Sequence, residues 1–191
     1  MKKLIYIPIL FFILSCSNLL KTQPKTINQS KVENIENEYK NHYDTTVARL
    51  INEKINEYRI SKGLYNLIQT DRYKSETEQY CAKAAQKITE TNIIEHSSLF
   101  FPGKWSEIIC SVPFNGAELS ADSLANRVVT AYINSRPHHV AILSIGVTKI
   151  HTSVYIYYNP KQKDWKLFTA SHTMDWEYEL DLKYSAIKLE Y

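Results

Sequence analysis

Apolar side chains recur every three or four positions in three stretches of the chain, which is the spacing of a helix with one buried face. The first stretch runs through "DTTVARLINEKINEYRISKG", and its apolar stripe is Val47, Ile51, Ile55 and Tyr58. Gly63 follows at the point where a helix would stop. The pattern predicts a helix from about residue 44 to residue 62.

Two further helices are predicted by the same spacing. One follows "GLYNLIQTD" and presents the stripe Tyr73, Thr77, Tyr80, Cys81, Ala84 and Ile88. The other begins at Ser120, a good N-cap, and continues to about Asn134. Pro137 discourages its continuation, so His138 and His139 are expected to begin a new short element.

The pattern changes after residue 143, where β-branched and aromatic residues dominate "SIGVTKI", "TSVYIYYN" and "DWKLFTAS". The pair "HT" and the turn sequence Asn-Pro-Lys-Gln-Lys separate these segments, which predicts an antiparallel meander. Helices first and strands later are typical of an α+β fold. We therefore predict an α-β-α sandwich with helices packed on a small, mainly antiparallel sheet.

The first residues resemble a bacterial lipoprotein signal, because Lys2 and Lys3 precede an apolar run that ends in Ile-Leu-Ser-Cys. The run is too short for a spanning helix, which needs about 20 residues. The resemblance predicts a signal peptide over residues 1–15 and lipid on Cys16. The alternative is an ordinary cleaved signal with an incidental cysteine. Both interpretations export the protein, and the first anchors it by lipid in the cell envelope, periplasmic or surface-exposed.

Composition and charge restrict the function classes. Loss of the leader removes Lys2 and Lys3 from a chain of net charge +3, so the mature protein is nearly neutral and a nucleic-acid partner is not expected. The segment from 16 to 42 is polar and is expected to be a tether. We expect one folded domain over residues 43–175 and a C-terminal extension over 176–191.

Two cysteines remain once Cys16 is assigned to lipid. Cys81 and Cys110 form an even pair in an oxidising compartment, which allows a disulfide between them. Cys81 also falls on the apolar face of a predicted helix, so two buried free thiols are the alternative.

Six blocks carry a resemblance to a known family: "INEYRISKGLYNLIQTD", "CAKAAQKI", "EHSS", "WSEII", "YINSRPHHVAIL" and "IGVTKI". In this order, over about residues 43–173, they resemble the CAP superfamily of cysteine-rich secretory proteins, antigen 5 and plant pathogenesis-related 1 proteins. The short bacterial branch with an SCP-like domain matches best. Its last short helix opens with a tryptophan, a serine and a histidine spaced by three, at positions held here by Tyr132, Ser135 and His138.

The resemblance implies a cleft of two histidines and an acidic residue that holds a divalent metal. By position these residues are His96, Glu107 and His138, a ligand set that suits zinc with an open position for water. His139 points about 100° away from His138 if both are helical, so it is not expected in the cleft. The alternative is a hydrogen-bonded His and Glu cluster that pins the loop from Asn92 to Lys104 against the third helix.

The chain also departs from the family. Ser106 and Ile108 replace the glycine and asparagine beside the glutamate, and Ser135 stands where animal and plant members carry a second glutamate. One cleft carboxylate instead of two makes a paired acid and base mechanism difficult. The other histidines, His42, His151 and His172, are expected at the solvent or at the rim.

Two function classes follow from these features. The first is a non-enzymatic binding domain, displayed on the cell envelope, for an unknown lipid, glycan or protein ligand. The second is a metal-dependent, peptidase-like hydrolase in which a metal on His96 and His138 activates water, with Glu107 as ligand or base.

Overall fold

The structure is a computed structural model that describes residues 41–99, 104–114 and 120–175. The predicted signal peptide, Cys16, the tether as far as residue 40 and the extension 176–191 lie outside these residues. Within the described ranges, no helix combines the length and the apolar character needed to cross a membrane.

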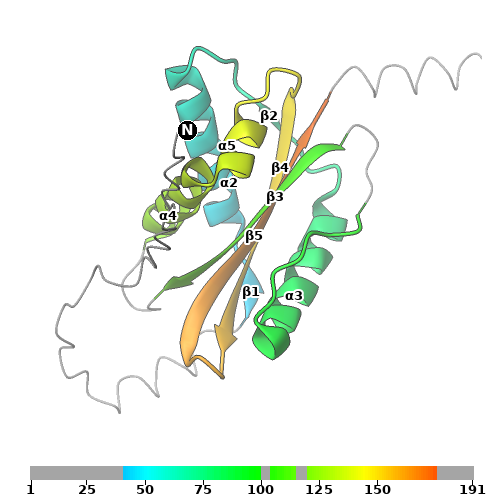
Figure 1. The fold of residues 1–191 in the computed structure, drawn as a ribbon, viewed down its shortest axis with the longest axis vertical. Helices are drawn as coiled ribbons and strands as arrows, with labels where there is room; N and C mark the ends of the chain where they lie inside the picture. Colours follow the sequence, from blue (N-terminus) through cyan, green and yellow to red (C-terminus); the bar gives the residue numbers. More distant parts are fainter. Residues whose placement is uncertain (1–40, 100–103, 115–119, 176–191) are drawn as a thin grey trace, which may run out of the picture.

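A five-stranded sheet forms the middle of the fold (Figure 1). Three long strands, β3 (Lys104–Phe114), β4 (Lys149–Asn159) and β5 (Asp164–Met174), are antiparallel, with β5 between the other two. The short strand β1 (His42–Tyr43) is antiparallel to β4, and β2 (Ile68–Gln69) is parallel to it. The sheet is therefore mainly antiparallel, as predicted.

Helices cover both faces of this sheet (Figure 1). Helix α3 (Lys74–Thr91) packs on one face, against β4 and β5. Helices α2 (Thr45–Ser61), α4 (Ala121–Asn134) and α5 (Arg136–Ile142) contact the sheet from the other side and pack on one another. The predicted α+β sandwich is confirmed.

Capping residues set the helix boundaries, and Ser120 and Gly63 are the predicted ones among them. The Asp44 side chain accepts a hydrogen bond of 2.9 Å from the Val47 amide at the start of α2, and Gly63 has the positive φ of 76° that ends the helix region. Ser120 caps α4 by accepting from the Ser123 amide. Pro137 lies in the first turn of α5, where its missing N–H costs nothing.

The strand predictions need two corrections. His151 and Thr152 do not separate two strands; they lie inside β4, which is continuous over 11 residues. Most of "SIGVTKI" is the connection between α5 and β4, and β3 was not predicted as a strand. The interior of β4 is covered on both faces, so polar residues there mark no turn.

Alternate residues of the long strands lie on opposite faces of the sheet and pack in two separate hydrophobic cores. One core lies between the sheet and helices α2 and α4, and its residues include Ile51, Ile55, Ile108, Val128, Tyr132, Ile150 and Leu167. The other lies under α3 and contains Cys81, Ala85, Ile88, Ile109, Tyr157, Phe168 and Ala170. The face on which a strand residue lies therefore decides which helices it meets.

Candidate functional site

A buried carboxylate on β3 is the centre of the predicted site. The Glu107 side chain is only 4% exposed. The Ser97 backbone N–H donates a hydrogen bond of 2.7 Å to Glu107 Oε1, and the Ser97 hydroxyl donates to Oε2. One residue of the preceding loop thus contacts both carboxylate oxygens.

Two histidines contact the same carboxylate. His96 Nδ1 lies 3.0 Å from Glu107 Oε1, and His172 Nε2 lies 2.8 Å from Oε2. The His96 side chain is 62% exposed, whereas that of His172 is fully buried. The structure therefore brings His96 and Glu107 together, as predicted from the sequence, and adds His172, which sequence reasoning missed.

Strand register explains the third member. Glu107 of β3 is opposite His172 of β5, and His172 is opposite His151 of β4, so the three side chains form a row across the sheet. Residues 107, 172 and 151 alternate with residues of the α2 and α4 core, which places the row on the face that α3 covers. Once the pairing of β3, β5 and β4 is known, this alternation identifies the row.

His151 is buried at the end of this row. Its Nδ1 lies 2.7 Å from the Thr70 carbonyl oxygen and its Nε2 lies 3.0 Å from the Ser153 hydroxyl. Burial lowers the pKa of His151, with a smaller lowering contribution from His172. The expectation that His151 and His172 lie at the solvent or rim was wrong, because both are interior residues of central strands; His42 is exposed.

The two histidines after Pro137 have different neighbours. The His138 ring meets the buried Tyr132 ring edge-on, with 5.6 Å between centroids, and burial, followed by the nearby His96, lowers its pKa. His139 Nε2 lies 2.9 Å from the Tyr58 hydroxyl of α2. The predicted divergence of the two rings is confirmed.

Metal binding by His96, Glu107 and His138 stays a prediction. In the described part of the chain, no three side chains of His, Cys, Asp or Glu are gathered as a metal-ligand group. Both Glu107 oxygens already accept hydrogen bonds from Ser97, and the His138 ring packs edge-on against Tyr132. A metal bound to Glu107 would therefore have to displace the hydrogen bonds from Ser97.

The cluster fixes the segment that follows α3. Ser97 and His96 attach this segment to Glu107. The Tyr80 hydroxyl of α3 donates a hydrogen bond of 2.6 Å to the Glu95 carbonyl oxygen. Lys87 of α3 also pairs with the Glu95 carboxylate. The described part of this segment, residues 92–99, is thus attached to β3 and to α3.

Cys81 and Cys110 are free thiols, so the possible disulfide is not formed. Cys81 packs in the core under α3, 3.7 Å from the Ser153 carbonyl oxygen, whereas Cys110 packs against the core under α4. The sheet separates them. Burial raises the pKa of both thiols, that of Cys110 to about 11, so neither is a reactive thiolate at neutral pH.

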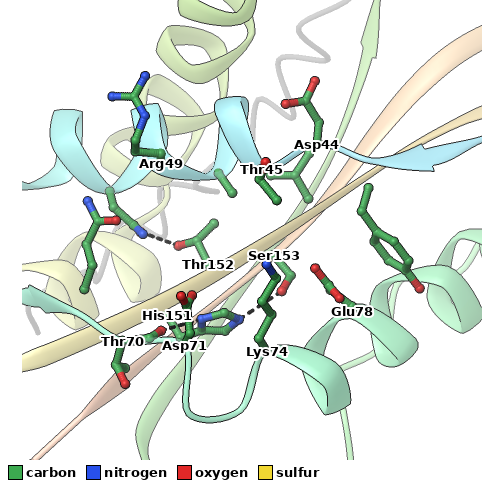
Figure 2. Close-up of a pocket in the computed structure, with 15 residues that line it drawn as sticks. Asp44, Thr45, Arg49, Thr70, Asp71, Lys74, Glu78, His151, Thr152 and Ser153 are labelled. Atoms are coloured by element: carbon green, nitrogen blue, oxygen red, sulfur yellow. Dashed lines mark hydrogen bonds between the residues drawn. The ribbon is translucent and has the colours of Figure 1, made fainter.

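A polar cavity of about 220 Å³ opens beside the histidine row (Figure 2). It lies between the first turns of α2 and α3, above β4, where His151 and Thr152 are held by hydrogen bonds. Charges of both signs line it: Asp44, Arg49, Asp71, Lys74 and Glu78. Sequence reasoning missed this cavity, because its lining comes from three separate segments of the chain with no common motif.

Comparison with known proteins adds little. No protein-family model matches the sequence. No curated protein matches it either. Among solved structures, the chain is similar to an outer surface protein from Borrelia burgdorferi, with 20% identity and a TM-score of 0.45, over 72% of this chain and 100% of that one.

Proposed function

We propose that this protein is an exported, lipid-anchored protein of the cell envelope whose CAP-like domain binds a ligand and catalyses no reaction. The observation that carries the proposal is the state of Glu107. Its carboxylate is the one acidic group of the predicted cleft, and its two oxygens accept from the Ser97 amide and hydroxyl and face His96 and His172.

A general base needs a free oxygen within reach of the proton that it removes. Glu107 is 4% exposed and surrounded by protein donors, which favours a structural role. Burial also keeps the thiols of Cys81 and Cys110 protonated, so neither is a ready nucleophile.

The polar cavity is the place proposed for the ligand. Its carboxylates, cations and hydroxyls suit hydrogen bonding to a small polar group, such as part of a glycan or a polar head group, better than an acyl chain. Its volume of about 220 Å³ admits only a small moiety. Of the three ligand classes predicted from the sequence, a glycan fits this lining best.

The metal-dependent hydrolase is the second candidate, and zinc titration distinguishes it from a binding module. Burial, followed by the charge of His96, lowers the pKa of His138 and so favours the neutral imidazole that a metal binds, which is the observation in its support. We expect no calorimetric zinc binding by the mature chain at pH 7. Binding that is lost in His96→Ala and His138→Ala but kept in His139→Ala would support the hydrolase and overturn the proposal.

Membrane anchoring through Cys16 has its own test. Replacement of Cys16 by alanine is expected to move the protein from the membrane fraction to the soluble fraction, because the acylated residue is lost. The control is Ser17→Ala, which leaves the Ile-Leu-Ser-Cys sequence intact and should fractionate as wild type. Ser15→Thr would not serve, because it alters the cleavage site. Membrane retention of the Cys16 variant would contradict the lipoprotein assignment.

A further inference from the structure

Four large apolar side chains are exposed at one end of the fold. Tyr65 and Ile145 are 90% and 86% exposed, and Val140 and Ile60 are 65% and 56% exposed. They belong to the C-terminal end of α2, the connection to β2, helix α5 and the connection from α5 to β4. We call these four residues the apolar tip.

Arg59 holds the segments of the tip together. Its buried guanidinium group donates to the carbonyl oxygens of Tyr65, Ile142 and Ser144, at 2.9, 2.6 and 3.0 Å. Ile60 follows Arg59, and Ile145 follows Ser144. Figure 1 shows the end of α2 and the connection before β4 at the same end of the molecule. The apolar tip is thus a fixed surface of the domain.

The sequence around the tip lacks acidic residues. Residues 58–70 and 132–163 contain no Asp or Glu, and they supply Lys62, Arg136 and Lys149. Glu57 lies just before the first segment. Exposed apolar residues on segments that carry cations and no acidic residues match a bilayer with anionic head groups. Exposed tyrosine is typical of the interface between lipid and water.

We propose that the apolar tip docks the domain on the anionic surface of a lipid bilayer. The inference rests on the proposed export and anchoring at Cys16, which would keep the domain near a membrane. The chain enters the domain at β1, away from the tip (Figure 1), and α2 separates the two by 17 residues, about 25 Å. The 25 peptide units between Cys16 and Asn41 span at most about 90 Å, so the anchor leaves the tip free to reach the bilayer.

A bilayer explains the whole pattern better than a protein groove would. Apolar side chains from two helices and two connections, with no common helical face, suit shallow insertion into lipid. The cations on the same segments, Lys62, Arg136 and Lys149, then meet lipid phosphates. A protein groove that accepts an amphipathic helix would instead match a single regular stripe.

The test uses the mature chain, residues 16–191, with Cys16→Ser so that no lipid is attached. Its partitioning is measured by co-sedimentation with vesicles of phosphatidylcholine alone and with 30% phosphatidylglycerol. We expect binding to the anionic vesicles, weakening severalfold in 0.5 M salt, and at least about a tenfold loss of the partition coefficient in Ile145→Asp. This test is independent of Cys16, so anchoring and docking can fail separately.

The matched control is Ile93→Asp, because Ile93 is 52% exposed and lies beyond the end of α3. It should bind as the parent chain does, and both variants should keep the parent's thermal midpoint. No binding to anionic vesicles, or equal loss in Ile93→Asp and Ile145→Asp, would overturn the proposal. Saturable capture by a protein with no vesicle binding would assign the tip to a protein partner and overturn it as well.

Discussion

Replacement of Glu107 by glutamine is expected to lower the free energy of unfolding by about 3 to 5 kcal/mol, the usual cost of removing one member of a buried charged network. The carboxylate joins the Ser97 segment, His96 and the fully buried His172. Glutamine keeps the size but places an NH₂ group where the protein presents donors, so at least one buried contact is lost. Urea unfolding at pH 7 measures the change.

The matched control is Glu95→Gln. Glu95 is also an acid paired with a cation, Lys87, but both side chains are about half exposed. Its replacement should change the unfolding free energy by less than about 1 kcal/mol, because solvent screens exposed pairs. A loss at Glu107 no larger than that at Glu95 would show that the buried network adds no stability.

Replacement of Arg59 by methionine is expected to lower the free energy of unfolding by about 3 kcal/mol or more. Arg59 is 2% exposed, and it donates to three carbonyl oxygens, two in connections and one at the end of α5. Methionine preserves the apolar stem but leaves these acceptors without that donor, and each buried unsatisfied acceptor costs about 1 to 3 kcal/mol. Burial lowers the pKa of Arg59, yet arginine stays charged at every pH where the fold is measured.

Arg49→Met is the control for the arginine variant. Arg49 lies on the same helix and pairs with Glu53 four residues on, but both side chains are largely exposed. We expect a change within about 0.5 kcal/mol, measured by the same thermal and urea unfolding. A similarly small change at Arg59 would mean that water replaces the guanidinium at the carbonyl oxygens.

The helices could be predicted from the sequence because their signals are local. An apolar stripe, a capping Ser120 and a terminating Gly63 all act within a few residues, and the structure uses each of them. Pro137 likewise marks the break between α4 and α5. These features depend on neighbours along the chain, so no tertiary contact was needed to find them.

The site was only half predictable because strand pairing is not local. The contact of Glu107 with His96 was expected from a sequence resemblance, but the contact with His172 depends on the register of β3 on β5. The polar pair His151 and Thr152 is typical of a turn, yet hydrogen bonds to Thr70, Ser153 and Asn52 satisfy both residues inside the sheet. A polar residue in a strand is a poor indicator of exposure when a partner lies across the sheet.

The cysteine pair shows the same limit. An even count in an exported chain allows a disulfide, but the alternation of β3 places Cys110 on the face away from α3 and Cys81. The face of the sheet on which a cysteine lies changes with every residue along the strand, and it decides whether two cysteines can form a disulfide. Composition contains no information about that face.

The most direct test of the central claim is a double-mutant cycle between Glu107 and His172. The claim is that the Glu107 carboxylate is bound by protein groups within the fold and is not free for catalysis. Urea unfolding is measured for wild type, Glu107→Gln, His172→Leu and the double variant. We predict a coupling energy of about 2 kcal/mol or more between the two positions. Additive losses, with a coupling energy near zero, would contradict the claim.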